Sequence, residues 1–402
     1  MKKGQLKDIT ILGILLLGLG MPCVISGEEL QIAQLHAKNT TSLKLLDESK
    51  HFKRFIYDSG FNFTYPDAVR GIYVTGPSAG GSQFESLVNL VESTDLNTMV
   101  IDIKEDHGNV TFRPEKGSPY EDVAQNYIDE PRKMLEKLEK KGIYPIARIV
   151  VFKDSVLAEK RPDLSFKKDG KVWTNGKGEA FVNPFKKEVW KYNVNLAKQA
   201  AALGFQEIQF DYVRFPEGFE HYDKELEYSQ GDYQDTDVEN IQRRVQAVTD
   251  FVKYAKKELA YYDVKVGVDI FGYSATIPEA PGIGQNFSKI ASNVDVISSM
   301  IYPSHWTAYF GIDFPDKHPY KLVTEYTKVE NDVLGKLDDP PISRPWIQDF
   351  EAPWLYDGAP TQYGKAEVEA QIKALQENGI NEFLIWNAAN VYTKNVDYTP
   401  ID

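Results

Sequence analysis

Apolar, β-type runs alternate with amphipathic stretches from residue 69 onward, and this alternation restricts the possible folds of the chain more than any other feature. Eight runs rich in β-branched and aromatic residues are expected to form strands, at residues 71–74, 98–103, 144–151, 207–211, 265–270, 294–301, 345–349 and 382–386. Helical spacing predicts helices between them, at residues 82–91, 129–141, 184–203, 237–259, 319–337 and 365–378. Strands that alternate with helices indicate βαβ units and a parallel sheet.

Eight such units within residues 67–402 favour an α/β fold, the (β/α)8 TIM barrel, with enlarged loops. A doubly wound open sheet is the alternative, and it usually carries a Gly-rich phosphate-binding turn after its first strand. The segment GPSAGG at residues 76–81 occupies that place, but it lacks both GxGxxG spacing and a P-loop Lys. We interpret it as a tight loop between a strand and a helix.

The first 26 residues have the pattern of an export signal. Three Lys within the first seven residues precede an apolar run over residues 9–19, and residues 24–26 offer a cleavage position. An uncleaved N-terminal anchor is one alternative, and lipidation of Cys23 is another, although Gly20-Met21-Pro22 is a poor approach to an acylated cysteine. We therefore expect a signal peptide or anchor at residues 1–26 and an exported protein, extracellular or in the cell envelope.

Residues 27–66 are polar and mixed, and they are predicted to form a tether followed by a short helical extension. The apolar residues with loosely helical spacing in this stretch are Leu43, Leu45, Leu46, Phe52, Phe55 and Ile56.

The charge balance narrows the possible partners. The chain has 46 Lys and Arg against 59 Asp and Glu, a formal net charge of −13. An acidic surface disfavours nucleic-acid backbones and anionic membranes as partners. We expect no nucleic acid, a membrane contact only through an N-terminal anchor, and a monomer.

Acids and aromatic residues follow the expected strands where a barrel keeps its chemistry, because the carboxyl ends of all eight strands converge on one bowl. Asp211 ends the fourth strand within the segment FDYVRFP, Asp269 ends the fifth, and Asp349 follows the seventh. The other candidate residues at these ends are Asp102, Arg148, Arg214, Tyr302, His305, Trp306, Gln348, Trp386 and Asn387.

This inventory suits glycoside hydrolysis. One carboxylate attacks the sugar or activates water, and a second carboxyl group protonates the leaving oxygen. Aromatic faces stack on sugar rings, and two acids close together raise the pKa of one of them, as an acid catalyst at neutral pH requires.

Structural roles compete with each of these assignments. An Asp after a strand is often a turn residue or a helix cap. Asp102 could pair with Lys104 or Arg148 as packing, Arg214 could be a surface residue, and Trp306 and Trp386 could belong to the core.

Other chemistries find little support. The six His residues form no HxH or HExxH pair for zinc, the only cysteine lies in the signal segment, and no GxSxG elbow occurs. A Mg²⁺ or Ca²⁺ site at Glu105 and Asp106 is possible by composition alone. We expect no metal and no cofactor.

At these residues the chain resembles a known family, the bacterial putative glycosyl hydrolase domain family, which belongs among the amylase-like (β/α)8 barrels. The resemblance covers about residues 67–395, and the segments that carry it are residues 70–75, 100–108, 147–154, 210–216, 269–272, 302–306, 348–349 and 386–387. It implies a barrel and a glycosidase.

The amylase-like pattern has a nucleophilic Asp after strand four, an acid/base after strand five and a further Asp after strand seven. The resemblance puts Asp211, Asp269 and Asp349 in these places. The chain departs from the pattern at Gln209, where an Arg is usual, and at Asp269, where a Glu is usual. These departures leave the retaining outcome and α-glucan specificity open.

The sequence thus predicts an exported glycoside hydrolase that acts on an extracellular or cell-envelope polysaccharide or oligosaccharide by carboxylate acid/base chemistry, with a retaining outcome expected. Asp211 is the expected nucleophile, or the base of an inverting variant; Asp269 is the general acid, and Asp349 stabilises charge. The remaining candidate residues bind substrate or position the acids. A non-catalytic carbohydrate-binding barrel at the cell surface is the alternative, and a metal-dependent phosphoesterase barrel is a third hypothesis.

Overall fold

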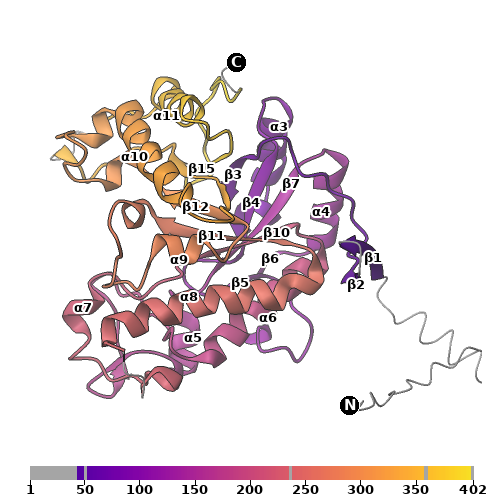
Figure 1. Ribbon diagram of the computed structural model, residues 1–402. Helices are drawn as coiled ribbons and strands as arrows, with labels where there is room; N and C mark the ends of the chain where they lie inside the picture. The colour runs from indigo at the N-terminus through magenta and orange to yellow at the C-terminus, as the bar shows by residue number, and fades with distance from the viewer. Residues whose placement is uncertain (1–42, 49–51, 235–237, 357–360, 400–402) are drawn as a thin grey trace, which may run out of the picture. The chain divides into compact units, whose positions relative to one another are not determined.

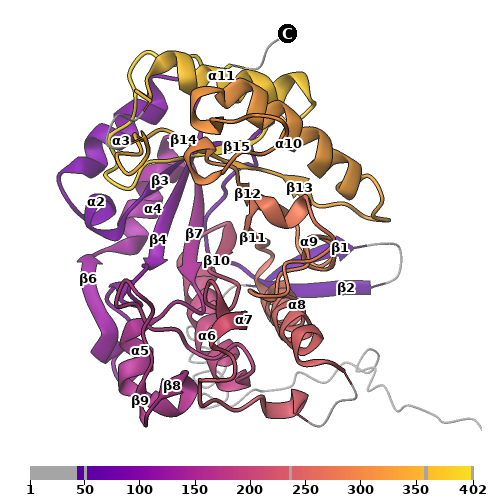
Figure 2. The same ribbon diagram turned by 90° about the vertical axis from the view of Figure 1, so that its left-hand side faces the viewer.

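Eight parallel strands close into a barrel in the part of the chain that the computed structural model describes, residues 43–48, 52–234, 238–356 and 361–399. In barrel order they are β3 (Arg70–Val74), β4 (Thr98–Lys104), β7 (Tyr144–Val150), β10 (Glu207–Asp211), β11 (Lys265–Phe271), β12 (Val296–Met300), β14 (Trp346–Gln348) and β15 (Phe383–Trp386). The pairing of β15 with β3, and of β3 with β4, closes the ring. The predicted TIM barrel is confirmed, and the open sheet is excluded because no strand of the ring is left with a free edge. Figure 2 shows β4 and β7 side by side in this ring.

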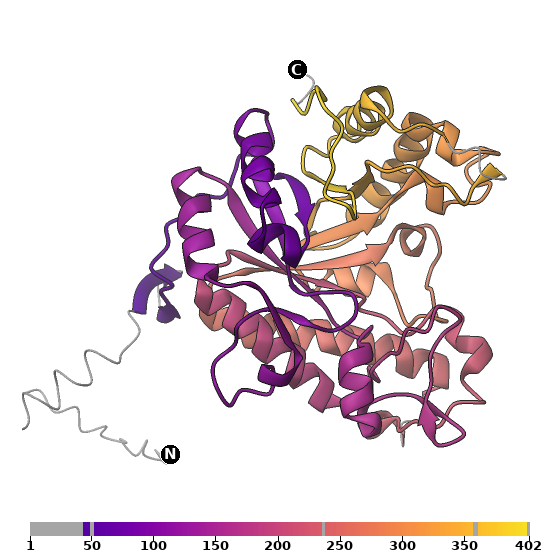
Figure 3. The same cartoon turned by 180° about the vertical axis from the view of Figure 1, so that it is seen from behind.

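Helices connect the strands and cover the outside of the barrel (Figure 1). The helices of the described ranges are α2 (Gly76–Gly80), α3 (Gln83–Glu92), α4 (Pro131–Lys140), α5 (Ser155–Lys160), α6 (Lys187–Leu203), α7 (Phe219–Tyr222), α8 (Asn240–Leu259), α9 (Phe287–Ala291), α10 (Pro319–Leu334) and α11 (Lys365–Glu377). The six helices expected from the spacing of apolar residues all form, with ends that differ by a few residues. Figure 3 shows the long helices α6 and α8 side by side, where they pack against each other.

Helix α6 illustrates how spacing produces this layer. Its buried residues include Val189, Asn193, Ala197 and Ala200, which recur every three or four positions and therefore share one face. The helix ends at Gly204, whose φ of +122° lies in the region that L side chains rarely adopt. A side chain there would also collide with the ring of Phe61, so the glycine both ends the helix and permits close packing.

Shorter strands extend the structure around the ring. At the end of β4, β5 (Val110–Phe112) pairs antiparallel with that strand, and β6 (Ala124–Ile128) pairs with β5. A small hairpin joins β8 (Lys167–Lys168) to β9 (Lys171–Val172), and β13 (Ile342–Ser343) adds to β12. These pieces lie within the enlarged loops that the sequence predicted.

The short helix expected near residues 43–56 was a wrong prediction. This stretch forms an antiparallel pair, β1 (Leu43–Glu48) and β2 (Phe52–Tyr57), with Leu43 opposite Tyr57. Aromatic and β-branched residues dominate its second half, and such residues favour strands over helices. The predicted signal or anchor at residues 1–26 lies outside the described residues. None of the helices in the described ranges combines the length and apolar character that a membrane crossing requires.

Side chains that point into the barrel form layers. A buried ion cluster lies near the amino ends of the strands, where Arg344 donates to Glu207 at 2.7 Å, to Glu382 at 2.8 Å and to the hydroxyl of Tyr65 at 2.9 Å. An apolar cluster includes Val100, Ile146, Trp346 and Leu384 from four different strands. Alternation along each strand brings every second residue into this interior.

The ion cluster yields a stability prediction. Arg344 and Glu207 are both fully buried, so removing the guanidinium in an Arg344→Ala variant leaves buried negative charge without a partner. We expect the free energy of unfolding to fall by about 3–5 kcal/mol in chemical denaturation at neutral pH.

The matched control is Lys336→Ala, which breaks a solvent-exposed ion pair with Asp332. It should change the free energy of unfolding by less than about 1 kcal/mol. A similarly small loss in Arg344→Ala would contradict the role assigned to the buried cluster.

Candidate active site

Arg148 is the centre of the polar network at the carboxyl ends of the strands. It lies on β7 with a side chain that is 1% exposed, and it donates to Asp102 at 2.7 Å and to Asp106 at 2.7 Å. Its Nε and Nη2 both donate to Oδ2 of Asp211, at 3.0 and 2.6 Å. Arg148 pairs in register with Asp102 on β4, so strand alternation directs both side chains into the barrel. One buried cation therefore holds three carboxylates together.

Asp211 ends β10 in a conformation that the backbone helps to maintain. Its Oδ1 accepts a hydrogen bond of 2.6 Å from the backbone N–H of Tyr212, and its Oδ2 is bound by Arg148. Tyr212 has a φ of +51°, a left-handed conformation that is uncommon for a bulky residue and concentrates at functional sites. The guanidinium and the N–H together fix the orientation of the Asp211 side chain.

Asp269 lies on the neighbouring strand in a different environment. Gln209 of β10 is opposite Gly267 of β11, so Asp211 and Asp269, two positions further along, follow the same inward alternation. Oδ1 of Asp269 accepts a hydrogen bond of 2.8 Å from the indole N–H of Trp346. Burial and the negative charge of Asp211 raise the pKa of Asp269 well above its usual range, although Arg148 acts in the opposite direction. The two carboxyl groups therefore lie in different electrostatic surroundings, Asp211 beside a guanidinium and Asp269 beside a neutral indole.

A second cation borders the network where it meets solvent. Lys153 binds Glu179 at 2.8 Å and Asp106 at 3.4 Å, and it lies 3.3 Å from the hydroxyl of Tyr212. The side chain of Asp106 is 41% exposed, unlike those of Arg148 and Asp102. Partial burial acts to raise the pKa of Asp106, but the charges of Arg148 and Lys153 outweigh it and lower this pKa.

Asp102 forms the inner end of the network. Its Oδ1 accepts from Arg148, and its Oδ2 accepts a hydrogen bond of 2.5 Å from the hydroxyl of Tyr73. Burial raises the pKa of Asp102 to about 6, against the opposing effect of Arg148. Of the two structural partners that the sequence suggested, the one observed is Arg148, whereas Lys104 lies in a separate pair with Asp154 at 2.6 Å.

Aromatic rings surround the carboxyl groups. Tyr73 and Trp386 stack with ring centroids 4.0 Å apart, and the Arg148 guanidinium lies 5.4 Å and 5.2 Å from their respective ring centres. Trp386 also contacts Trp346 at 5.5 Å and Tyr302 at 6.4 Å. Trp386 is only partly buried, so one large aromatic surface beside the acids remains accessible.

The hydrogen bonds of the Asp349 side chain join it to Thr393, in the segment after β15. Both of its carboxylate oxygens accept hydrogen bonds from Thr393, one from the backbone N–H at 2.8 Å and one from the hydroxyl at 2.6 Å. Asn387 donates to the carbonyl oxygens of Asp349 and Val391, at 2.5 and 2.8 Å. Both residues therefore anchor the loop after β15, and the catalytic role of Asp349 stays a prediction.

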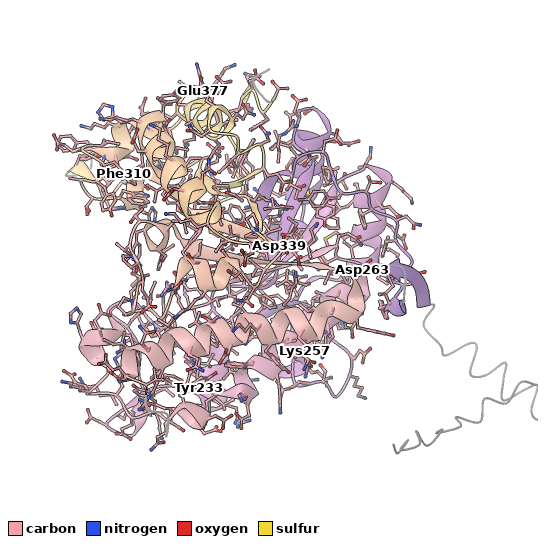
Figure 4. All side chains as sticks on the ribbon, viewed as in Figure 1. Tyr233, Lys257, Asp263, Phe310, Asp339 and Glu377 are labelled. Carbon is pink, nitrogen blue, oxygen red and sulfur yellow. The ribbon has the colours of Figure 1, made fainter. Side chains whose placement is uncertain are left out.

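Arg214 and Trp306 form no hydrogen bond with Asp211 or Asp269 among the described contacts, although the Arg214 guanidinium lies 4.8 Å from the ring centre of Tyr212. Arg214 donates to Glu217 at 2.9 Å, and its guanidinium lies 4.6 Å from the ring centre of Phe271. Trp306 packs at 5.8 Å against Phe310, which is labelled in Figure 4, and against Tyr326 of α10.

Gln348 and His305 belong to the neighbouring loops. The Gln348 amide accepts from the backbone N–H of Ser304 at 3.0 Å and donates to the carbonyl of Phe350 at 2.9 Å, which ties the loop after β12 to the loop after β14. His305 is exposed, and its ring lies 5.4 Å from that of Tyr302.

Sequence reasoning missed four residues of the network as site residues. They are Tyr73, Asp106, Lys153 and Tyr212. Tyr73 lies on the inward face of the first barrel strand, a position that strand alternation could have revealed. The other three lie in loops or carry an unusual backbone angle, and the sequence pattern holds no signal for either property.

Glu105 and Asp106 do not converge as a metal site would require. Glu105 accepts from the backbone N–H groups of His107 and Asn109, at 2.9 and 2.8 Å, whereas Asp106 binds Arg148. In the described residues, no group of three or more His, Cys, Asp or Glu side chains is arranged to hold a metal ion.

A cavity among the described residues lies elsewhere. It has a volume of about 320 Å³ and is lined by the start of α10 and by α11, including Lys317, Tyr320 and Glu367. Neither of these helices contributes to the network around Arg148. The charges, strand ends and unusual pKa values all coincide at the barrel mouth, so we place the candidate site there rather than in the cavity.

Three solved structures are among those similar to this chain. A hypothetical protein from Ruminiclostridium thermocellum ATCC 27405 is 30% identical over 49% of this chain and 96% of its own, with a TM-score of 0.42. The PgaB (BpsB) glycoside hydrolase domain from Bordetella bronchiseptica is 14% identical, covers 80% of this chain and 94% of its own, and has a TM-score of 0.54. A β-galactosidase from the psychrophilic Marinomonas ef1 is 13% identical over 79% of this chain and 54% of its own, with a TM-score of 0.53.

The likeness to the last two proteins shows the fold alone, because their identity to this chain is low. No curated protein sequence matches this chain. A family model, described as a putative glycosyl hydrolase domain, matches residues 71–392. That span runs from the first barrel strand to beyond the last and includes all of the network around Arg148. The chain therefore belongs to the putative glycosyl hydrolase domain family.

Proposed function

We propose that this protein is a glycoside hydrolase that cleaves an extracellular or cell-envelope polysaccharide through Asp211 and Asp269. The observation that carries the proposal is the contrast between these two carboxyl groups on adjacent strands. Asp211 is bound by a guanidinium and a backbone N–H, whereas Asp269 is bound by a neutral indole and its pKa is raised. Glycosidases need one carboxylate and one carboxylic acid, and we assign the first role to Asp211 and the second to Asp269.

The chemistry follows from these protonation states. Asp211 attacks the anomeric carbon as the bond to the leaving oxygen breaks, and Asp269 gives its proton to that oxygen. In the second step Asp269 takes a proton from water, which attacks the anomeric carbon and releases Asp211. Arg148 holds Asp211 in position throughout, through two hydrogen bonds to the same oxygen.

Other residues would bind the sugar. Asp106 is the most exposed carboxylate among those bound to Arg148, so it is suited to accept hydrogen bonds from sugar hydroxyls. Trp386 is partly exposed beside the acids, and its ring packs on the buried Tyr302, so it offers a surface on which a sugar ring could stack. The substrate is then a neutral or cationic carbohydrate, in keeping with the net charge of −13.

The proposed location rests on the sequence. The export pattern in residues 1–26 directs the protein out of the cytoplasm, where its substrate would be a polysaccharide of the envelope or the surroundings. The protein is proposed to act there as a monomer.

One observation favours the second candidate, a carbohydrate-binding barrel without turnover. Both oxygens of Asp211 are already engaged in hydrogen bonds, and the residue is only 4% exposed. In that case the acids and rings would recognise a sugar without cleaving it. Turnover assays separate the two candidates.

The first test replaces the proposed catalytic groups. Asp269→Asn should lower kcat on the best substrate from a panel of envelope polysaccharides by about 10²–10⁴-fold, because the proton donor is lost. Asp211→Asn should lower it at least as much. The measurement is the rate at which reducing ends are released.

The control for this test is Asp332→Asn, whose exposed carboxylate binds Lys336 on the outside of the barrel. It should retain far more activity than either of the other variants. Sugar binding by Asp211→Asn without turnover by the wild type on any polysaccharide would favour the binding protein, and full activity in Asp269→Asn would rule out the proposed acid.

The pH dependence tests the raised pKa of Asp269. A general acid must be protonated, so kcat/KM should fall as the pH rises through the pKa of Asp269, well above the usual range for a carboxyl group. On a nitrophenyl glycoside, whose leaving group needs little protonation, this alkaline decline should weaken. If the alkaline decline of kcat/KM persists unchanged in Asp269→Asn, the titrating group is a residue other than Asp269.

The stereochemical outcome tests the role of Asp211. If Asp211 is the nucleophile, the first product keeps the anomeric configuration of the substrate, as proton NMR during hydrolysis would record. An inverted first product would instead make Asp211 the base that activates water.

A further inference from the structure

A continuous row of aromatic rings leads from Asp269 to the surface. The row begins at Trp346, whose indole donates to Asp269, and continues through Trp386 to Tyr302 with centroid separations of 5.5 and 6.4 Å. From Tyr302 it continues to His305 at 5.4 Å and then to Trp354 at 5.8 Å. Phe350 packs beside this row, 5.7 Å from Tyr302 and 6.0 Å from His305.

Trp354 is the outer end of the row and the most exposed aromatic side chain among the described residues, at 61%. Other exposed aromatic residues occur, such as Tyr261 at 45%, which contacts only Tyr57 and Tyr262 among the rings of the described residues. Exposure alone therefore does not distinguish Trp354 from these residues. Trp354 differs because ring contacts connect it through Tyr302 to the proposed catalytic carboxyl group.

The segment that carries Trp354 is held in place before any ligand binds. The side chain of Gln348 donates to the carbonyl of Phe350, and Ala352 is fully buried. The backbone N–H of Leu355 donates to the carbonyl of Ala352 at 3.0 Å, which closes a turn around Trp354. The residue before Trp354 is Pro353, whose φ is restricted by its ring. Binding on this ring would cost little conformational entropy.

We infer that Trp354 is a sugar-stacking platform that binds a ring of the polysaccharide at a distance from the bond being cleaved. This inference rests on the proposed function, because it takes Asp269 as the acid. A flat indole with open space above it matches the apolar face of a pyranose, and burial of that surface supplies binding energy. The protein would therefore prefer a chain of several sugars to a single glycoside.

The test compares variants on substrates of increasing length. For Trp354→Ala, kcat/KM on the polysaccharide should fall on the order of tenfold more than kcat/KM on a nitrophenyl monosaccharide, because only the longer chain reaches the ring. Along a series of oligosaccharides the loss should appear at one length and persist above it. Trp354→Phe, which keeps a smaller ring and preserves the packing on His305, should recover part of the loss.

Tyr261→Ala is the matched control, since it removes an exposed ring far along the chain from the site loops and should leave both activities unchanged. Equal losses on long and short substrates, or no loss on either, would overturn the inference. If the wild type cleaves no glycan, the proposed function fails separately. In that case oligosaccharide affinity measured by calorimetry still tests whether Trp354 binds sugar. An affinity that is unchanged in Trp354→Ala would overturn the inference.

Discussion

The guanidinium of Arg148 is the interaction on which the rest of the site depends. Without it, Asp102 and Asp211 would be buried negative charges beside a third, partly exposed one on Asp106. Buried like charges of this kind cannot all stay ionised unless a cation lies among them. Arg148 suits this position because its planar group donates in several directions at once and is not deprotonated at physiological pH.

A second buried guanidinium binds carboxylates at the opposite end of the barrel, where its role is structural. There Arg344 lies between Glu207 and Glu382, and its positive charge balances the two carboxylates inside the barrel. At the mouth Arg148 binds three acids, and a fourth, Asp269, accepts from the neutral N–H of Trp346 instead of a guanidinium. Burial and the negative charge of Asp211 raise the pKa of Asp269, and this distinguishes the mouth from the cluster around Arg344.

Much of the fold could be predicted because the eight strands and six long helices carry strong periodic patterns, and strand ends in a barrel converge by geometry. The pair Asp211 and Asp269 followed from the same rule. The strand pair β1–β2 was not predicted, since the spacing of its apolar residues is loosely helical, whereas its aromatic and β-branched content favours strands. Asp349, Arg214 and Trp306 satisfy the same positional rule as Asp211, yet their side chains find partners in the loops.

The sequence by itself determined that this chain forms a barrel and that acids lie at the ends of its strands, because both properties depend on local patterns of residues. Only the tertiary structure decided which acids share a cation, which one is left with a neutral donor and which rings connect Trp354 to Asp269. Those relations join strands and loops that are tens to hundreds of residues apart in the chain. A carboxyl group's protonation depends on its three-dimensional surroundings, and position in the sequence does not specify them.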